Sequence, residues 1–231
     1  MTTPDPAGAL LARLQSFLLP GGVERARSVR RVRLKEQGEM RSAPDARWIP
    51  FTAEERIDAR QSGFLWEARF RTARVVPMVV VDAYEERRGR LVVKLGGAVP
   101  LVNSRGPELD RGELQRYLAY ASLCPPMLAA NERLVWTAAG AQTLRVRDAD
   151  DSTGATVDYE IGEEGCPIRS RAERPRAVGK KPIPTLWAAT GLEFCERDGL
   201  FVATRLEAAW LLPGGWFTYF REEVTSFIAE P

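Results

Sequence analysis

Hydrophobic residues recur at two different spacings along the chain, and each spacing predicts a different kind of element. Over residues 7–18 leucines and a phenylalanine follow one another at helical spacing, and Pro20 ends the predicted helix. From about residue 30 apolar and polar residues alternate, so that Val32 and Leu34 share one face of a predicted strand over residues 30–41. An apolar inner face and a polar outer face are typical of an antiparallel sheet with one side in water.

The same alternation predicts ten further strands. They are residues 64–70, 75–85, 91–95, 132–138, 142–148, 154–161, 167–173, 186–196, 201–212 and 216–228. Capping-box patterns predict two more helices: Thr52 with Glu55 for a helix over residues 53–59, and Asp110 with Glu113 for one over residues 110–123. Residues 174–184, rich in proline, glycine, arginine and lysine, are predicted to form a loop.

The order of these elements predicts the fold class. Short strands that follow one another without a β-α-β rhythm favour a mainly β (α+β) fold with a large antiparallel sheet. We expect a single domain over residues 1–231, in which residues 1–22 form an N-terminal helix and connector. Residues 30–228 then form the sheet, with a helical insert at about 107–126.

Composition limits the chemistry available to this chain. Its 231 residues include no histidine, which removes Ser–His–Asp triads, Cys–His dyads, His-ligated zinc and proton transfer by imidazole. Cys124, Cys166 and Cys195 are odd in number and form no C-x-x-C pair, so we expect free thiols in a reducing compartment. The formal net charge of +2 is too balanced to predict nucleic-acid binding.

The given sequence shows no recognisable export signal, membrane span or cofactor-binding motif. Arg13 interrupts the first apolar stretch and no basic segment precedes it, which argues against an export signal. No apolar run reaches the roughly 18 residues of a membrane span, so we expect a cytoplasmic location. The sequence holds no glycine-rich phosphate loop and no metal-ligand spacing, and we therefore predict neither a cofactor nor a metal.

Several stretches together resemble a bacterial family of uncharacterised proteins, the DUF6544/DUF6920-type domains. The matching stretches are Val32–Arg41, Trp48–Glu54, Gly63–Ala68, Asp82 with Tyr84, Gly106–Ala119 and Phe217–Thr225. They follow one another in order over residues 30–228. The resemblance implies a fold similar to lipoprotein carriers of the LolA/LolB type, in which an open antiparallel half-barrel curves around two or three helices and holds an apolar ligand.

This chain departs from that pattern in two places. We expect it to lack the export signal of a lipoprotein carrier. Its second sizeable helix ends in Cys124-Pro125-Pro126, where the family tends to have an aromatic residue before proline. The departure predicts a specialised junction between this helix and the next strand, and with it a specialised pocket beside the junction.

Glu36 and Asp82 are the leading candidates for acid–base chemistry. By strand parity Glu36 shares a face with Val32 and Leu34, and apolar surroundings raise the pKa of a carboxyl group. The alternatives for Glu36 are a strand irregularity that turns it outward and a structural pairing with a buried arginine. Asp82 and Tyr84 share a strand face and could orient a carbonyl or hydroxyl group, or form a hydrogen-bonded structural pair on the outer face.

The predicted second helix and the aromatic residues supply the remaining candidates. Glu113, a third candidate for catalysis, and Arg116 are neighbours on the helix surface, although the capping box already explains Glu113. Arg116 is a candidate anchor for an anion, and Tyr117 belongs to the same polar and aromatic stripe on the helix surface. The candidates for contact with a ligand are Trp48, Phe64, Trp66, Tyr84, Arg116, Tyr117, Tyr219 and Arg221.

Three functional hypotheses follow. The first is binding of a hydrophobic small molecule or lipid-like ligand in the chamber of the half-barrel. The second is a cofactor-independent cyclase, isomerase or dehydratase that acts on a hydrophobic, polyketide-like metabolite through Asp and Glu. The third is an interaction module without a pocket. An open apolar groove favours the first, an isolated inward carboxylate in a closed chamber favours the second, and a filled core favours the third.

Overall fold

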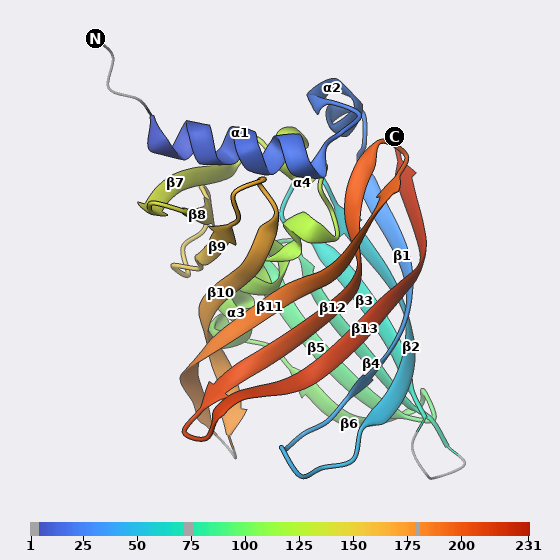
Figure 1. Cartoon of the computed structure of the whole chain (residues 1–231). Coiled ribbons are helices and arrows are strands. Elements are labelled where there is room, and N and C mark those ends of the chain that lie inside the picture. The colour runs from blue at the N-terminus through green and yellow to red at the C-terminus, as the bar shows by residue number, and fades with distance from the viewer. Residues whose placement is uncertain (1–4, 72–75, 179–180) are drawn as a thin grey trace.

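The computed structural model describes residues 5–71, 76–178 and 181–231. Within these residues one antiparallel sheet of 13 strands carries most of the chain, in the order β6-β5-β4-β3-β2-β1-β13-β12-β11-β10-β9-β8-β7. Strands make up 56% of the residues and helices 17%. The sheet is strongly curved, so that one of its faces is concave, as Figure 1 shows.

The sheet consists of two meanders that meet at one seam. The first contains β1 (Arg31–Met40), β2 (Ile49–Asp58), β3 (Phe64–Phe70), β4 (Met78–Glu85), β5 (Arg88–Leu95) and β6 (Val99–Ser104). The second contains β7 (Leu134–Gly140), β8 (Thr143–Asp148), β9 (Val157–Ile161), β10 (Pro167–Val178), β11 (Lys181–Arg197), β12 (Leu200–Leu212) and β13 (Gly215–Glu230). The seam is the antiparallel pairing of β1 with β13, which leaves β6 and β7 as the two edges. The sheet is therefore an open half-barrel, which confirms the predicted fold class.

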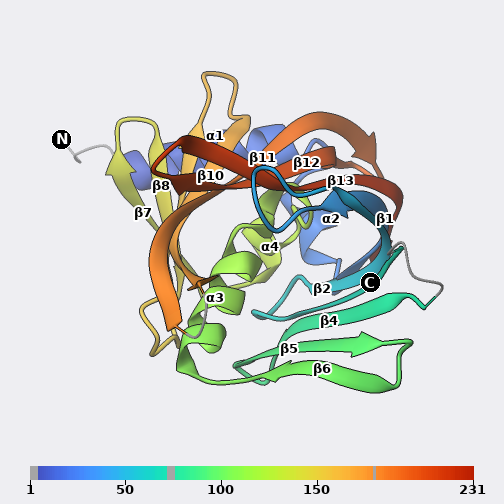
Figure 2. The same cartoon turned by 90° about the horizontal axis from the view of Figure 1, so that it is seen from below.

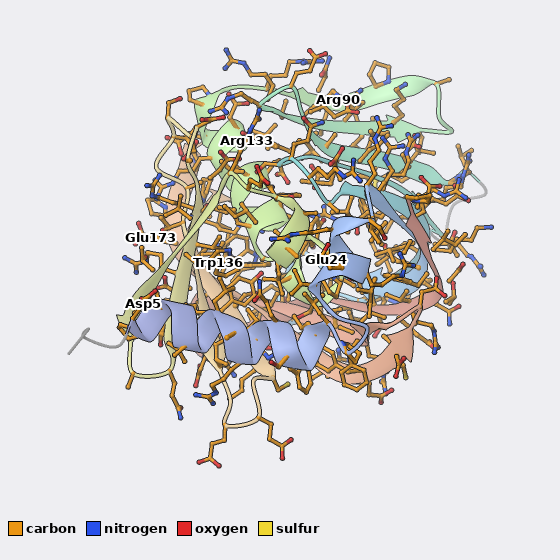
Figure 3. All side chains as sticks on the ribbon, turned by 90° about the horizontal axis from the view of Figure 1, so that it is seen from above. Asp5, Glu24, Arg90, Arg133, Trp136 and Glu173 are labelled. Atoms are coloured by element: carbon orange, nitrogen blue, oxygen red, sulfur yellow. The ribbon has the colours of Figure 1, made fainter. Side chains whose placement is uncertain are left out.

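The helices occupy one end and the hollow of this sheet. They are α1 (Pro6–Leu18), α2 (Val23–Arg27), α3 (Pro107–Leu118), the 3-10 turn η1 (Tyr120–Ser122) and α4 (Met127–Ala130). The helix α1 lies across one end of the half-barrel, where it packs against β7, β8 and β12 (Figures 1 and 3). Seen from below, the sheet curves around α3, which packs against β4, β5, β8 and β10 (Figure 2). None of the helices in the described part of the chain is both long and apolar enough to cross a membrane.

A continuous hydrophobic core joins the sheet to both groups of helices. Leu14 and Leu18 of α1 and Tyr117 of α3 are fully buried, and the inward residues of the strands pack against them. Each large apolar side chain buried in this way contributes roughly 1.5–3 kcal/mol. Asp5 caps α1, since its carboxylate accepts a hydrogen bond from the Ala7 backbone N–H at 3.1 Å.

Two strands lie where the sequence pattern predicted something else. Residues 53–59, predicted as a helix, belong largely to β2, which pairs with β1 and β3 on either side. Phe51, Ala53, Glu55 and Ile57 are all buried at intervals of two residues. One of these inward residues is a glutamate, which interrupts the alternation of apolar and polar residues that indicates a strand. Glu55 was therefore interpreted as part of a helix capping box. The edge strand β6 is a further addition to the eleven predicted strands.

The predicted loop over residues 174–184 was also wrong. Residues Arg174–Val178 extend β10 and residues Lys181–Pro184 open β11, with Pro175 paired to Pro184 across the ladder. Prolines remove backbone donors, yet they are tolerated at ladder positions whose N–H needs no partner. Residues 179 and 180 of the predicted loop lie outside the described residues.

The second capping box is likewise replaced by a different contact. The N-cap of α3 is Gly106, and Asp110 stands one turn inside the helix. The Asp110 carboxylate instead accepts hydrogen bonds from the Gly89 backbone N–H at 2.7 Å and from Arg88 Nη1 at 2.9 Å. Asp110 therefore fastens the start of α3 to the turn between β4 and β5.

A close backbone approach at the seam generates a first prediction. A Cβ atom on Gly38 of β1 would overlap the backbone oxygen of Arg221 in β13 and lie 2.7 Å from Cζ of Phe51. We expect Gly38→Ala to lower the free energy of unfolding by about 1–3 kcal/mol, because the backbone must shift to relieve the overlap. Urea unfolding measures the effect, with Gly214→Ala as the control, since a Cβ there meets nothing within 4 Å. Equal loss of stability in both variants would contradict the close packing of the seam.

Candidate functional site

A cavity of about 270 Å³ lies between the helical segment α3–η1 and the concave face of the sheet. Its apolar lining consists of Met40, Trp66, Val80, Leu91, Ala119, Leu123, Trp187, Ala189, Leu206, Ala208 and Phe220. The polar groups on its wall are Asp82, Arg116, Tyr120, Arg174, Glu207, Tyr219 and Glu222. The hollow is therefore not filled by the protein's own side chains, as an interaction module without a pocket would require.

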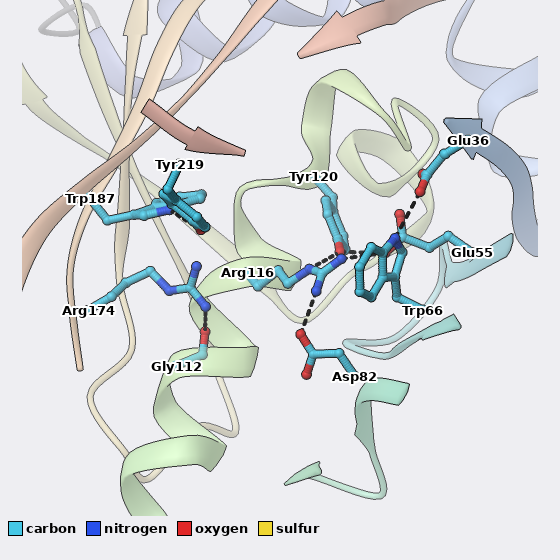
Figure 4. Close-up of polar contacts among 10 residues, drawn as sticks. All are labelled: Glu36, Glu55, Trp66, Asp82, Gly112, Arg116, Tyr120, Arg174, Trp187 and Tyr219. Carbon is cyan, nitrogen blue, oxygen red and sulfur yellow. Dashed lines mark hydrogen bonds and ion pairs between the residues drawn. The ribbon is translucent and has the colours of Figure 1, made fainter. Parts of the chain in front are cut away.

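Arg116 is the centre of the polar network on this wall. Its guanidinium donates from Nη1 to Asp82 Oδ2 at 2.5 Å, from Nη2 to Glu55 Oε1 at 3.2 Å, and from Nε to the Tyr120 hydroxyl at 2.5 Å (Figure 4). Tyr120 in turn donates to Glu55 Oε1 at 2.6 Å. The guanidinium also lies 5.0 Å from the centre of the Trp66 ring. Each direction of the cation is thus matched by a carboxylate, a hydroxyl or an aromatic face.

Two pairs of carboxyl groups flank Arg116. Glu36 lies beside Glu55 and accepts a hydrogen bond from Trp66 Nε1 at 2.9 Å, while Glu113 lies beside Asp82. Burial, reinforced by Glu222 and Glu55, holds the pKa of Glu36 well above its ordinary value. Burial and the Asp82 carboxylate raise the pKa of Glu113 to about 8. Glu36 and Glu113 are therefore the proton carriers of the two pairs.

Protons on these two residues explain otherwise orphaned oxygens. Glu36 Oε1, Asp82 Oδ1 and Glu113 Oε2 are buried, and no N–H or O–H of the described residues reaches them. A carboxylic acid beside a carboxylate supplies the missing donor, because its O–H bonds to the neighbouring oxygen. In each pair the carboxyl group next to Arg116, that of Glu55 or of Asp82, forms an ion pair with the guanidinium.

Counting charges gives the same result for the whole cavity region. Five buried or nearly buried carboxyl groups, Glu36, Glu55, Asp82, Glu113 and Glu222, stand against two guanidinium groups, those of Arg116 and Arg174. Buried unpaired charges are costly, so the region approaches neutrality when three of the five carboxyls hold a proton. The third proton belongs to Glu222, because burial and the negative charge of Glu55 raise its pKa to about 8.

Arg174 and Trp187 form the opposite wall. The Arg174 guanidinium stacks over the Trp187 ring at 4.7 Å and donates from Nη2 to the Gly112 backbone oxygen at 2.7 Å. Trp187 Nε1 donates to the Tyr219 hydroxyl at 3.1 Å, and Figure 4 shows these groups facing Arg116. Arg174 Nε is buried without a partner among the described residues.

The structure brings several of the predicted site residues together. Trp66, Asp82, Arg116 and Tyr219 line the cavity directly. Glu36 and Glu113 are buried next to lining residues and reach the cavity through Trp66 and Asp82. Glu36 faces inward and is desolvated, as the acid–base hypothesis required. It also belongs to the network around the buried Arg116, as the hypothesis of a structural pairing required.

Other predicted ligand contacts lie elsewhere. Phe64 and Tyr84 line a separate, arginine-rich hollow at the surface, although the Phe64 ring also lies 4.9 Å from the Arg116 guanidinium. Tyr117 is fully buried, where its hydroxyl donates to the Asp58 backbone oxygen at 3.1 Å and accepts from Asn131 Nδ2 at 3.0 Å. These two bonds satisfy the Tyr117 hydroxyl and leave it no free donor for a ligand.

Trp48 and Arg221 also lie away from the cavity. Both the Arg41 and the Arg221 guanidinium stack on Trp48, at 4.4 and 4.7 Å, and Arg221 forms ion pairs with Glu39 and Glu207. Tyr219 and Arg221 were predicted to share a face, but a bulge intervenes. Ala208 pairs with Phe220 and Ala209 with Thr218, so Tyr219 is an extra residue and the parity of β13 inverts after it.

The bulge also explains why Glu222 escaped sequence reasoning, since parity from Tyr219 placed it outward. Glu55 was missed because its strand was read as a helix, and Arg174 because its strand was read as a loop. One local signal was available for Glu55: Phe51, Ala53 and Ile57 alternate around it with period two.

These features define a class of protein: an open β half-barrel with a helix in its hollow and, between them, a mostly apolar cavity beside a cluster of buried carboxyl groups. The chain belongs to the DUF6544 family, a family of unknown function whose sequence model matches residues 1–222. No curated protein matches the chain.

Two solved structures are similar in fold. A DUF1329 family protein from Desulfovibrio piger is 10% identical, with a TM-score of 0.53 over 98% of this chain and 94% of that chain. A LolA superfamily protein from Nitrosomonas europaea is 12% identical, with a TM-score of 0.49 over 97% and 94% of the two chains. At these identities the similarity concerns the fold alone.

Within the described residues no three carboxylate or cysteine side chains converge as metal ligands.

The raised pKa of Glu113 generates a prediction for stability. A glutamate loses its proton near pH 4.5 in the unfolded chain and near pH 8 in the folded one, so the native state binds more protons over this interval. The free energy of unfolding should then fall as pH rises from about 5 to 8, by up to about 1.4 kcal/mol per pH unit for each such group. Glu113→Gln stays neutral and keeps a donor toward Asp82, so its slope should be shallower.

Urea unfolding at a series of pH values measures these slopes. The matched control is Glu108→Gln, which removes an exposed carboxylate from the first turn of the same helix. Identical slopes for Glu113→Gln and the unmodified protein would contradict a buried, protonated Glu113.

Proposed function

We propose that this protein binds a small hydrophobic molecule in the cavity between α3 and the sheet. The supporting observation is the cavity itself, about 270 Å³ in volume, with large apolar and aromatic side chains on its wall and few polar groups. Ligand sites typically combine an apolar lining with a few placed polar groups in this way. The volume lies just below the about 300–1,000 Å³ of sites that enclose drug-sized ligands, which favours a small ligand or one apolar segment of a larger one.

The polar groups of the wall suit such a ligand. Arg116 is already satisfied by Asp82, Glu55 and Tyr120, so it holds the cavity open rather than awaiting a partner. A wall whose side chains are fixed before binding loses little entropy when the ligand enters. We place this activity in the cytoplasm as part of the proposal, on the ground that Cys124, Cys166 and Cys195 are all free thiols.

Filling the cavity should abolish binding. Ala208 of β12 is buried on the cavity wall, so Ala208→Phe occupies the space of the ligand. We expect this variant to weaken binding of the neutral apolar dye Nile red at least tenfold, measured by fluorescence titration. Ala138→Phe, at an exposed position of β7, adds the same ring outside the cavity and serves as the control.

The outcome of this titration decides the proposal. Circular dichroism and thermal unfolding establish that both variants fold. Equal dye affinity in the folded Ala208→Phe and Ala138→Phe proteins would show that the dye binds elsewhere and would remove the cavity from the function. Native mass spectrometry of gently purified protein then measures the mass of any ligand that co-purifies from the cells.

A second candidate function is cofactor-independent proton transfer on a hydrophobic metabolite, as in an isomerase, cyclase or dehydratase. The observation that favours it is the Asp82–Glu113 pair, in which the Arg116-paired carboxyl group of Asp82 on the cavity wall stands next to Glu113, whose pKa burial raises to about 8. Such a pair contains both a base and an acid near neutral pH. Glu36, behind Trp66, would act on the substrate only through its neighbours.

Hydrogen exchange tests this second function without knowledge of the product. A panel of apolar ketones and β-keto thioesters is incubated with the protein in D₂O, and deuterium uptake is followed by mass spectrometry. If the function is catalytic, Asp82→Asn should slow protein-dependent uptake by about 10²–10⁴-fold, the usual share of general acid–base catalysis. Uptake that is unchanged in Asp82→Asn would exclude Asp82 as the base, and Glu108→Gln is again the control.

A further inference from the structure

The charged and titratable groups around the cavity come from nearly every element packed there. They are Glu36 of β1, Glu55 of β2, Asp82 of β4, Glu113 and Arg116 of α3, Tyr120 of η1, Arg174 of β10, Glu207 of β12, and Tyr219 and Glu222 of β13. Glu207 is paired outward with Arg221 at 3.1 Å, which leaves the five buried carboxyls and two guanidiniums to set the charge of the cavity. The carboxyl groups exceed the guanidiniums by three.

Glu222 differs from the other four carboxyls because nothing holds it. Glu55 and Asp82 are paired with Arg116, Glu36 is bonded to Trp66, and Glu113 lies against Asp82. The Glu222 side chain makes no hydrogen bond or ion pair with any residue in the described ranges, although only 8% of its surface is exposed. The Glu222 oxygens are not among the fully enclosed atoms that lack a partner, so they keep some exposure, and Glu222 sits on the cavity wall where a ligand can reach it.

The charge of the cavity discriminates among the head groups that a hydrophobic ligand can carry. An anionic head group would add a negative charge to a region where three carboxyls already need protons to avoid mutual repulsion. A neutral head group would leave the charge unchanged. A cationic head group takes the place of one of those protons and gains a charge-assisted hydrogen bond to the carboxylate that it leaves behind.

The aromatic lining favours the same head group. Trp66 and Trp187 stand on the cavity wall, and each already has an arginine guanidinium over its ring, at 5.0 and 4.7 Å. Tyr219 and Phe220 add two more rings beside Glu222 in the sequence of β13. Ring faces attract cations most strongly where water is excluded.

We propose that the ligand of this cavity is a hydrophobic amine, bound as its ammonium ion with the Glu222 carboxylate as the counter-ion. This inference rests on the proposed function, because it assigns the chemical class of the ligand at the same site. The apolar part of the amine lies against the wall of Trp66, Leu206 and Ala208, and its nitrogen points toward Glu222.

Binding then exchanges a proton for an ammonium ion. Glu222 enters as the neutral acid and releases its proton to the solvent, while the amine arrives already protonated, so the charge of the cavity stays the same. Because burial and Glu55 raise the pKa of Glu222 to about 8, protons compete with the amine below that pH. The affinity for an alkylammonium ion should rise about tenfold for each pH unit between 6 and 8, with release of about one proton per ligand.

Three probes of one shape test the inference: octylamine, 1-octanol and octanoate, titrated against the full chain at pH 7 by calorimetry. We expect octylamine to bind at least tenfold more tightly than octanol, and octanoate to bind more weakly than either. Titrations in two buffers of different ionisation enthalpy count the released protons. The preference for octylamine and its proton release should both disappear in Glu222→Gln, whereas octanol affinity should stay within about threefold.

The neighbouring residue provides a matched control. Glu223 is exposed on the opposite face of β13, where it accepts a hydrogen bond from Gln37 at 3.0 Å, so Glu223→Gln removes the same charge without touching the cavity. This variant should keep the amine preference. Thermal unfolding of both variants verifies the fold, and the near-isosteric amide replaces what is already a neutral acid at pH 7.

The outcomes separate this inference from the function on which it rests. Equal binding of octylamine and octanol, or the same amine preference in Glu222→Gln, overturns the ammonium site and leaves a cavity for neutral ligands. Tighter binding of octanoate than of octylamine also overturns it and would indicate that an anionic head group pairs with Arg174. If none of the three probes binds, the ammonium site is overturned, and the Nile red titration alone decides whether the cavity binds apolar ligands.

Discussion

The guanidinium of Arg116 joins the helix in the hollow to the sheet that surrounds it. Through Asp82 and Glu55 it connects α3 to β4 and β2, and through Tyr120 it fixes the turn that follows the helix. These contacts are buried, so removal of Arg116 would leave two carboxylates without a counter-charge, an arrangement that costs about 3–5 kcal/mol. The width of the cavity depends on this bridge, because it sets how far α3 stands from the strands.

An excess of acid around a buried cation makes the cavity a site of proton storage. Five carboxyl groups share the charge of two guanidiniums, and protons make up the difference. In the two pairs next to Arg116 the proton is held between carboxyl groups and contributes to structure. Glu222 holds its proton alone on the cavity wall. Four carboxyl groups of the cluster are thus held by other residues of the protein, while the Glu222 carboxyl group has no hydrogen-bond partner among the described residues.

Irregularities in β13 decide which groups face the cavity. The bulge at Tyr219 allows Tyr219, Phe220 and Glu222 all to reach the concave side, which a regular strand with alternating faces would not permit. A second register shift, between Lys35 and Glu36 of β1, lies on the other side of the same strand. The seam that joins the two meanders is therefore also the part of the sheet where the cavity wall is shaped.

The sequence by itself determined the class of fold and one half of the polar cluster. A capping-box pattern located much of α3, with Glu113 and Arg116, although the N-cap of this helix is Gly106. Alternation along β1 and β3 identified the inward faces, and with them Glu36 and Trp66, while helical spacing identified α1. These predictions succeed because each depends on a period within one short segment. The family resemblance then extended an antiparallel sheet to an open half-barrel.

Only the tertiary structure decided how the cluster is completed. Glu55 faces inward because β2 is held between β1 and β3, and Glu222 faces inward because β13 must bulge to follow β12. Arg174 belongs to the wall because β10 continues through its prolines alongside β11. In each case the orientation of a side chain is fixed by a partner strand that is distant or differently registered, and a local period contains no information about that partner.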